Sequence, residues 1–124
     1  MISINISCGE YFDKLSILYI KKEKIIDESK LILINYEINE LEKLNIFSKL
    51  DNSIFEKLKN IYIELWNIED NIREKEKKKE FDTEFIDLAR KVYITNDKRA
   101  DIKLQINKLL NSSIIEVKSY SDYK

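Results

Sequence analysis

The sequence contains no histidine, no proline, one glycine and one cysteine. Without histidine, the chain lacks the usual general base near neutral pH, the Ser-His and Cys-His nucleophile pairs, and the commonest metal ligand. The single Cys8 excludes an internal disulfide and a Cys-based zinc site, which fits a reducing compartment. We therefore assign no catalytic residue, no metal and no cofactor, and an enzymatic function is not favoured.

The scarcity of glycine and proline also leaves few residues that end a helix. Of the 124 residues, 36% are charged and 44% are hydrophobic, a mixture that suits long amphipathic helices. The length is that of one domain, residues 1–124, which can bury a core without disulfides. The composition therefore predicts a single all-α domain.

Neither charge sign dominates, because 22 Lys and Arg balance 23 Asp and Glu. No overall field recruits nucleic acid or an anionic membrane. The N-terminal MISINIS lacks a basic region followed by a long apolar one, and no apolar run approaches the roughly eighteen residues of a membrane span. We predict a cytoplasmic protein that binds neither nucleic acid nor a membrane.

Two helical patterns occupy the first part of the chain. The first begins at Ser7, where Ser7 and Glu10 have the spacing of a capping box, and it meets no helix breaker until about Asn45. The second follows an apolar stripe from Ile54 to Ile72 with alternating steps of four and three. Each pattern predicts one helix.

A third helical pattern begins after Asp82 or Thr83 and ends at residues 111–113. Because the connections near residues 46–53 and 79–83 are short, consecutive helices are expected to be antiparallel neighbours. The prediction is an antiparallel three-helix bundle with a long first helix. The β-prone ends, ISINI and IIEVKSY, predict short terminal strands that could pair with each other.

The first predicted helix is longer than the second, at about 38 residues against about 25, which leaves an overhang of roughly 25 Å at 1.5 Å per residue. The overhang is rich in apolar side chains, and an exposed patch of this kind usually marks an interface. We predict a homodimer in which the overhangs pack together, unless the helix breaks near Asp27–Ser29 and folds back. The expected interface residues are Tyr11, Phe12, Leu15, Leu18 and Tyr19.

A polar stretch, Thr95-Asn96-Asp97, interrupts the apolar spacing of the third helix, which from Val92 next falls on Asn96 and Arg99. Folding about the predicted turns aligns this stretch with a second face of the middle helix. We predict one polar network with Trp66 at its edge. Its members are Trp66, Glu69, Arg73, Arg90, Tyr93, Asn96, Asp97 and Arg99.

This network has two interpretations. Three Arg beside a Tyr hydroxyl and an Asn amide could hold the phosphate or carboxylate of a small anionic ligand, such as a nucleotide or nucleotide-sugar. A structural ion-pair network that sets the register of the helices is the favoured interpretation, because buried charges are usually paired.

Other motifs point weakly to enzymes. Glu37 with Glu40 and Glu84 with Asp87 have the spacing of metal-binding pairs in all-α nucleotide pyrophosphohydrolases, but the predicted bundle places the two pairs far apart. A chorismate-mutase-like dimer needs cations on its first helix, where only lysines are available. The run from Lys75 to Lys79 is interpreted as a solvated helix end. A metal-dependent nucleotide hydrolase is therefore the last of three candidate functions.

Four segments, GEYFDKLSIL, LWNIEDNIR, FIDLARKVYITNDKRADIKLQIN and EVKSY, together cover nearly the whole chain. With this ordered set the chain resembles an uncharacterised family of small bacterial and cyanophage proteins, domain of unknown function 6165. In that family the first helix typically opens with Ser-Pro-Gly-Glu, whereas here Cys8 takes the proline position.

The resemblance implies no established activity and no catalytic residues, and it suggests neighbourhoods of surface-polysaccharide synthesis. We predict a non-catalytic, homodimeric helical interaction or assembly module, as an accessory to such synthesis. Binding of a small anionic ligand at the Arg cluster is the alternative.

Overall fold

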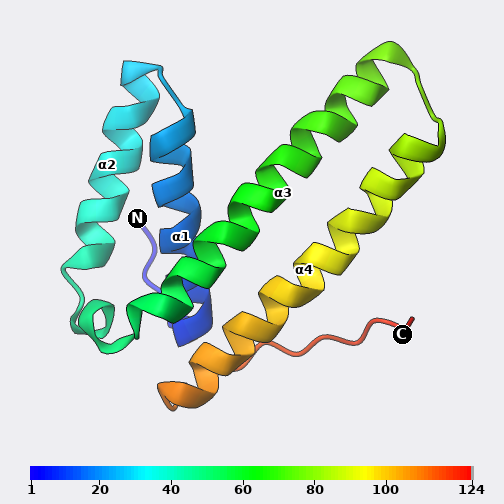
Figure 1. The fold of residues 1–124 in the computed structure, drawn as a ribbon. Coiled ribbons are helices and arrows are strands. Elements are labelled where there is room, and N and C mark those ends of the chain that lie inside the picture. Colours follow the sequence, from blue (N-terminus) through cyan, green and yellow to red (C-terminus); the bar gives the residue numbers. More distant parts are fainter. Residues whose placement is uncertain (124) are drawn as a thin grey trace.

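The computed structural model describes residues 1–123 and consists of α-helices and irregular segments (Figure 1). The helices are α1 (Cys8–Lys24), α2 (Glu28–Glu42), α3 (Asn52–Lys78) and α4 (Thr83–Leu109), with a short 3-10 helix η1 (Asn45–Lys49). The all-α prediction is confirmed. The three-helix count is wrong, because four α-helices form, and so are the terminal strands, because no strand forms within residues 1–123.

The predicted long first helix is divided between α1 and α2. Ile25 leaves the helical conformation with φ −89° and ψ 134°, and Asp27 then caps α2 by accepting a 2.9 Å hydrogen bond from the backbone N–H of Ser29. An Asp side chain at this position satisfies an N–H group that the first turn of a helix leaves unpaired. The break therefore lies near Asp27–Ser29, where the sequence left it open.

The apolar side chains of α1 lie inside the chain itself. Tyr11, Phe12, Leu15 and Leu18 are buried in the core, and Tyr19 is half-buried against it. The argument that these residues form a dimer interface does not hold, because α2 folds back and covers what a straight helix would expose to water. The hydroxyl of Tyr11 donates a 2.6 Å bond to the carbonyl of Leu41 on α2.

The core lies where α1, α2, the start of α3 and the end of α4 converge. Two edge-to-face aromatic pairs join α1 to α3, with ring centroids 6.1 Å apart for Phe12 and Phe55 and 5.7 Å apart for Tyr19 and Phe55. Such contacts add to the stabilisation by area burial. The buried members are Tyr11, Phe12, Leu15, Leu18, Ile34, Ile38, Phe55, Leu58 and Ile106.

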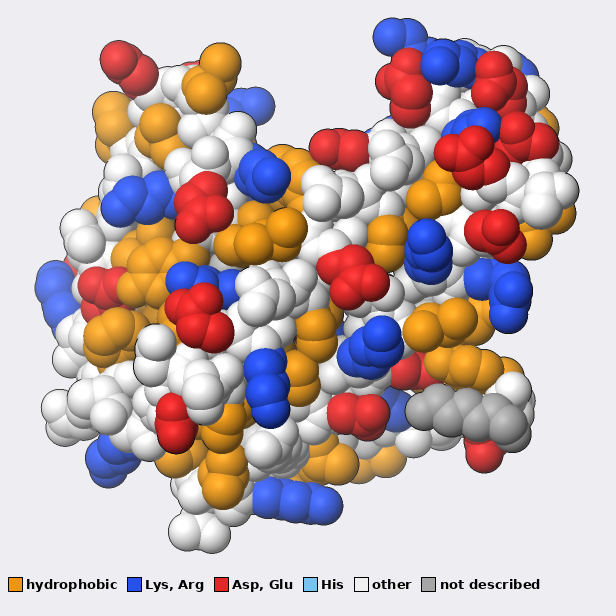
Figure 2. Space-filling model, in the orientation of Figure 1, with side chains coloured by type: hydrophobic (Ala, Val, Ile, Leu, Met, Phe, Trp, Pro, Cys, Tyr) orange, Lys and Arg blue, Asp and Glu red, His pale blue; other side chains and the backbone are white. Residues whose placement is uncertain are grey.

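Beyond this core, α3 and α4 continue together as a hairpin that projects away from α1 and α2 (Figure 1). Charged side chains gather at its tip (Figure 2). There, the Lys75 ammonium contacts the carboxylates of Glu80, Asp82 and Glu84 at 3.2, 2.9 and 3.2 Å. Lys79, the residue that caps the end of α3, adopts the left-handed conformation with φ 55°, which glycine adopts more easily than lysine.

None of the helices formed by residues 1–123 combines the length and the apolar character that a membrane span requires.

Candidate functional site

The first turn of α1 packs directly on the last turns of α4. The N–H of Gly9 donates a 2.6 Å hydrogen bond to the side-chain oxygen of Asn107, and the N–H of Cys8 donates to the hydroxyl of Ser112 at 3.2 Å. A Cβ on Gly9 would lie 2.5 Å from the carbonyl oxygen of Lys103, closer than real contacts allow. The one glycine of the chain therefore permits the close approach of α1 and α4.

One turn further along α1, the buried carboxylate of Asp13 meets Arg99 of α4. Arg99 Nε lies 2.7 Å from Asp13 Oδ1, and Nη2 lies 2.6 Å from Oδ2, so two parallel bonds form. Asp13 is 2% exposed. The hydrogen bonds that Arg99 donates to Asp13 outweigh the effect of burial and raise the pKa of the Arg99 guanidinium above its ordinary value. This pair fixes α1 against α4.

Lys103, one turn after Arg99, contacts three carboxylates. Its ammonium lies 2.8 Å from Glu10, 3.1 Å from Glu116 of the C-terminal segment and 4.0 Å from Asp13. Burial acts to lower the pKa of Lys103, but the bonds to Glu10 and Glu116 outweigh it, and the pKa is raised. The lysine therefore stays cationic and links α1, α4 and the C-terminal segment.

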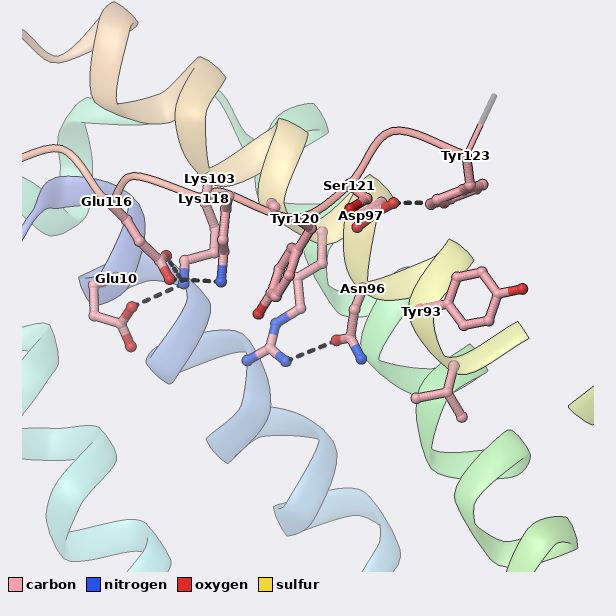
Figure 3. A pocket seen from close by; sticks show the side chains of 13 residues that line it. Glu10, Tyr93, Asn96, Asp97, Lys103, Glu116, Lys118, Tyr120, Ser121 and Tyr123 are labelled. Carbon is pink, nitrogen blue, oxygen red and sulfur yellow. Dashed lines mark hydrogen bonds and ion pairs between the residues drawn. The ribbon is translucent and has the colours of Figure 1, made fainter. Parts of the chain in front are cut away.

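The C-terminal segment after α4, residues 113–123, runs back along α4 and roofs a groove of about 730 Å³ (Figure 3). Glu116 contacts Lys103 near one end, and the hydroxyl of Tyr123 donates to Asp97 near the other. The Tyr123 ring also meets Tyr93 edge to face, with centroids 5.2 Å apart. The lining residues are Glu10, Val92, Tyr93, Asn96, Asp97, Arg99, Ala100, Lys103, Glu116, Lys118, Tyr120, Ser121 and Tyr123.

The structure brings together half of the polar network predicted from the sequence. Tyr93, Asn96, Asp97 and Arg99 line the groove, and the Arg99 guanidinium reaches the Asn96 amide oxygen at 3.4 Å. The buried Thr95 explains how a helix passes through this stretch, because its side chain points into the fold where the apolar stripe would otherwise continue.

The other four predicted members do not line the groove, so the prediction of a single network of eight residues is wrong. Trp66, Glu69 and Arg73 line a separate shallow hollow on α3 with Tyr62. Arg73 pairs with Glu69 one turn back on its own helix. Arg90 is exposed on the projecting part of α4. The cause is the broken first helix: α1 supplies Asp13 as the partner of Arg99, a role that the sequence argument gave to α3.

The sequence argument missed Glu10, Asp13, Lys103 and Glu116 as members of the site. A signal was present in the spacing of Gly9, Asp13, Ser16 and Ile20, all of which are buried. These residues follow steps of four and three, and therefore define one face of α1. A glycine, an acid and a hydroxyl on a buried face indicate close helix contact and a polar partner.

The two acidic pairs considered for a metal site do not meet. Glu37 and Glu40 lie on α2, whereas Glu84 and Asp87 lie at the distal start of α4 (Figure 1). Glu37 contacts Lys14 at 3.1 Å, and Glu84 contacts Lys75 at 3.2 Å. Within residues 1–123, no group of three or more Cys, Asp and Glu has an arrangement that could hold a metal ion.

The groove is balanced in charge. Arg99, Lys103 and Lys118 face Glu10, Asp97 and Glu116 along its lining, with Asp13 behind. Each of the three cations contacts a carboxylate: Arg99 contacts Asp13, Lys103 contacts Glu10, and Lys118 contacts Glu116. The lining therefore carries equal numbers of cationic and acidic side chains.

The fold and the site define a small helical protein in which the C-terminal segment lies on a polar groove between α1 and α4. A family model described as "Family of unknown function (DUF6165)" matches residues 2–123. The chain therefore belongs to this family, as its resemblance in sequence indicated. A search of curated proteins and a search of solved structures each found no match.

Proposed function

We propose that the protein is a non-catalytic interaction module that forms a homodimer through the outer face of α2. The observation that carries the proposal is a cluster of three large apolar side chains on this face. Ile32, Leu33 and Tyr36 are 69%, 71% and 61% exposed. Tyr36 lies one helical turn after both Ile32 and Leu33, so the three side chains are neighbours. Water is a poor environment for such a cluster, which is typical of an interface.

The rest of this face carries little net charge. Glu40 follows the apolar cluster on α2 and pairs at 2.8 Å with Lys43, the residue just after the helix. Self-paired charges can be covered by a partner more easily than isolated ones. A two-fold dimer places the same patch of each copy against its equivalent, and an apolar strip on one straight helix meets that requirement.

The test is the mass of the protein in solution for wild type and for Leu33→Glu. Light scattering coupled to gel filtration should show a dimer for wild type at tens of micromolar. Leu33→Glu places two like charges at the centre of the interface and should give a folded monomer. The circular dichroism spectrum should be unchanged, because Leu33 is exposed in the single chain and its replacement leaves the fold intact.

Ile86→Glu is the matched control, because Ile86 is 55% exposed on the projecting hairpin, away from α2. This variant should remain a dimer. A monomeric wild type would refute the proposed interface, and so would a Leu33→Glu protein that is still dimeric. The expectation that the module serves surface-polysaccharide synthesis rests on the family resemblance alone.

Binding of a small anion is the second candidate, supported by the groove and by its three cations, Arg99, Lys103 and Lys118. Inorganic phosphate at millimolar concentration should then raise the melting temperature of wild type by mass action. Lys118→Ala should remove this rise, since the Lys118 side chain is 44% exposed and carries little of the fold. No rise in the wild type would exclude phosphate as the anion.

A further inference from the structure

We propose that the groove between α1 and α4 is a binding site for extended peptide segments of a partner protein. The recognised segment carries a carboxylate followed by a tyrosine, as Glu116 and Tyr123 do in the C-terminal segment. This segment, residues 113–123, lies over the helical side of the groove and acts as a displaceable internal ligand (Figure 3). The inference concerns a surface separate from the face of α2 and does not depend on dimerisation.

The helical wall of the groove is complete without residues 113–123. Arg99 is held by two bonds to the buried Asp13, and Lys103 is held by Glu10 at 2.8 Å. Groups held in this way keep their positions when a ligand leaves, and a preformed site loses little conformational entropy on binding.

The side chains of Glu116 and Tyr123, in contrast, hold residues 113–123 to the wall. Lys103 donates to the carboxylate of Glu116, and Asp97 accepts from the hydroxyl of Tyr123. Residues 113–121 make no backbone–backbone hydrogen bond with the described helices. Val117 and Tyr120 are 85% and 78% exposed. This is how a bound peptide is held, and it differs from the packing of a structural element.

The hinge for displacement lies at Asn111 and Ser112. Asn111 adopts the left-handed conformation, with φ 54°, and the Ser112 N–H donates a 2.8 Å bond to the carbonyl of Asn107. The hydroxyl of Ser112 also accepts from Cys8. These bonds finish α4 and fix α1 to it before residue 113. Residues beyond the hinge can therefore leave the groove while the helix ends keep their bonds.

The wall selects the chemistry of its ligand. Lys103 presents a cation that a carboxylate can reach, and Asp97 presents an acceptor that requires a hydroxyl or N–H donor. Tyr93 adds a ring that packs against the edge or face of another aromatic side chain. A partner segment with an acidic residue and a tyrosine in the same order satisfies all three groups.

The test uses the full chain with both Glu116→Gln and Tyr123→Phe. These substitutions weaken the contacts of residues 113–123 with Lys103 and Asp97. A fluorescent peptide with the sequence of residues 113–123 is titrated into this variant and into wild type. Anisotropy should show at least tenfold tighter binding to the variant, because the intact internal segment of wild type competes at high effective concentration. The same peptide with both substitutions should bind neither protein.

Two results would overturn the proposal: the native peptide failing to bind the folded variant, or the substituted peptide binding equally well. Amide hydrogen exchange on the unaltered protein gives an independent check. Residues 113–121 should exchange orders of magnitude faster than the centre of α4, and equal protection would make the segment a fixed part of the fold. If free peptide dissociates a wild-type dimer, residues 113–123 of one copy bind the groove of the other copy. That result would overturn the proposal that the segment occupies the groove of its own chain.

Discussion

Asp13 and Arg99 are separated by 86 positions in the chain and meet in a pair of parallel hydrogen bonds of 2.7 and 2.6 Å. The Asp13 carboxylate is almost completely buried, whereas the Arg99 guanidinium is partly exposed and lines the groove. The pair joins the first helix to the last and positions Arg99 beside Asn96. A structural role and a place in the groove are therefore combined in one residue.

Arg99→Ala should lower the free energy of unfolding by about 3 kcal/mol or more, because it leaves the Asp13 carboxylate buried without its main cation. Urea denaturation followed by circular dichroism measures the change. Arg73→Ala is the matched control, since Arg73 pairs with Glu69 on an exposed helix surface and should cost less than about 1 kcal/mol. Equal losses for the two variants would contradict the role assigned to the buried pair.

Gly9→Ala should destabilise the protein by about 1–3 kcal/mol, although alanine favours helix more than glycine does. The added Cβ would meet the Lys103 carbonyl oxygen at 2.5 Å, and that oxygen belongs to the backbone and cannot turn away. Lys22→Ala, at an exposed position of the same helix, should change stability by less than about 0.5 kcal/mol. Thermal melts of both variants test this, and a stabilised Gly9→Ala protein would show that α1 and α4 are not so close.

Lys79→Gly should stabilise the protein by about 0.5–1 kcal/mol, because it removes a side chain from a left-handed position that ends α3. The exposed pair of Lys79 with Glu76 is lost, but it contributes little. Lys78→Gly, one residue earlier and still helical, should destabilise instead. Opposite signs in the melting temperatures are the expected result, and a loss in both variants would contradict it.

Stability should fall as the pH drops below about 4, the ordinary range of an Asp carboxyl. Bonds from the backbone N–H and side chain of Ser53 lower the pKa of Asp51, and bonds from Ser29 lower that of Asp27. A carboxyl whose pKa is depressed by folding stabilises above its unfolded pKa, and this contribution disappears as the pH falls through the folded pKa.

Asp51→Asn isolates one of these caps, because asparagine caps a helix equally well but does not titrate. Urea midpoints from pH 6 to pH 2.5 should therefore fall less steeply for the variant than for wild type, with similar values at pH 6. Parallel curves would indicate that the Asp51 cap takes no part in acid unfolding.

The positions of the helices were largely predictable from local features. The capping Ser7 and the predicted start of the third helix after Asp82 or Thr83 match the observed starts of α1 and α4. The end of α1 was harder to predict, because it depends on two adjacent isoleucines and on the Asp27–Ser29 cap in a region whose apolar pattern continues. Without glycine or proline, a chain gives little local warning of a turn.

The sequence alone determined that the chain is helical, since composition, spacing and caps act within a few residues of one another. It also marked the stretch from Tyr93 to Arg99 as unusual, because polar residues replaced expected apolar ones. Only the tertiary structure decided the partners of that stretch. Because α2 folds back against α1, α1 packs inside the fold, and one of its faces lies on α4 and places Asp13 beside Arg99. Contacts between distant segments depend on which turns form, and no local pattern carries that information.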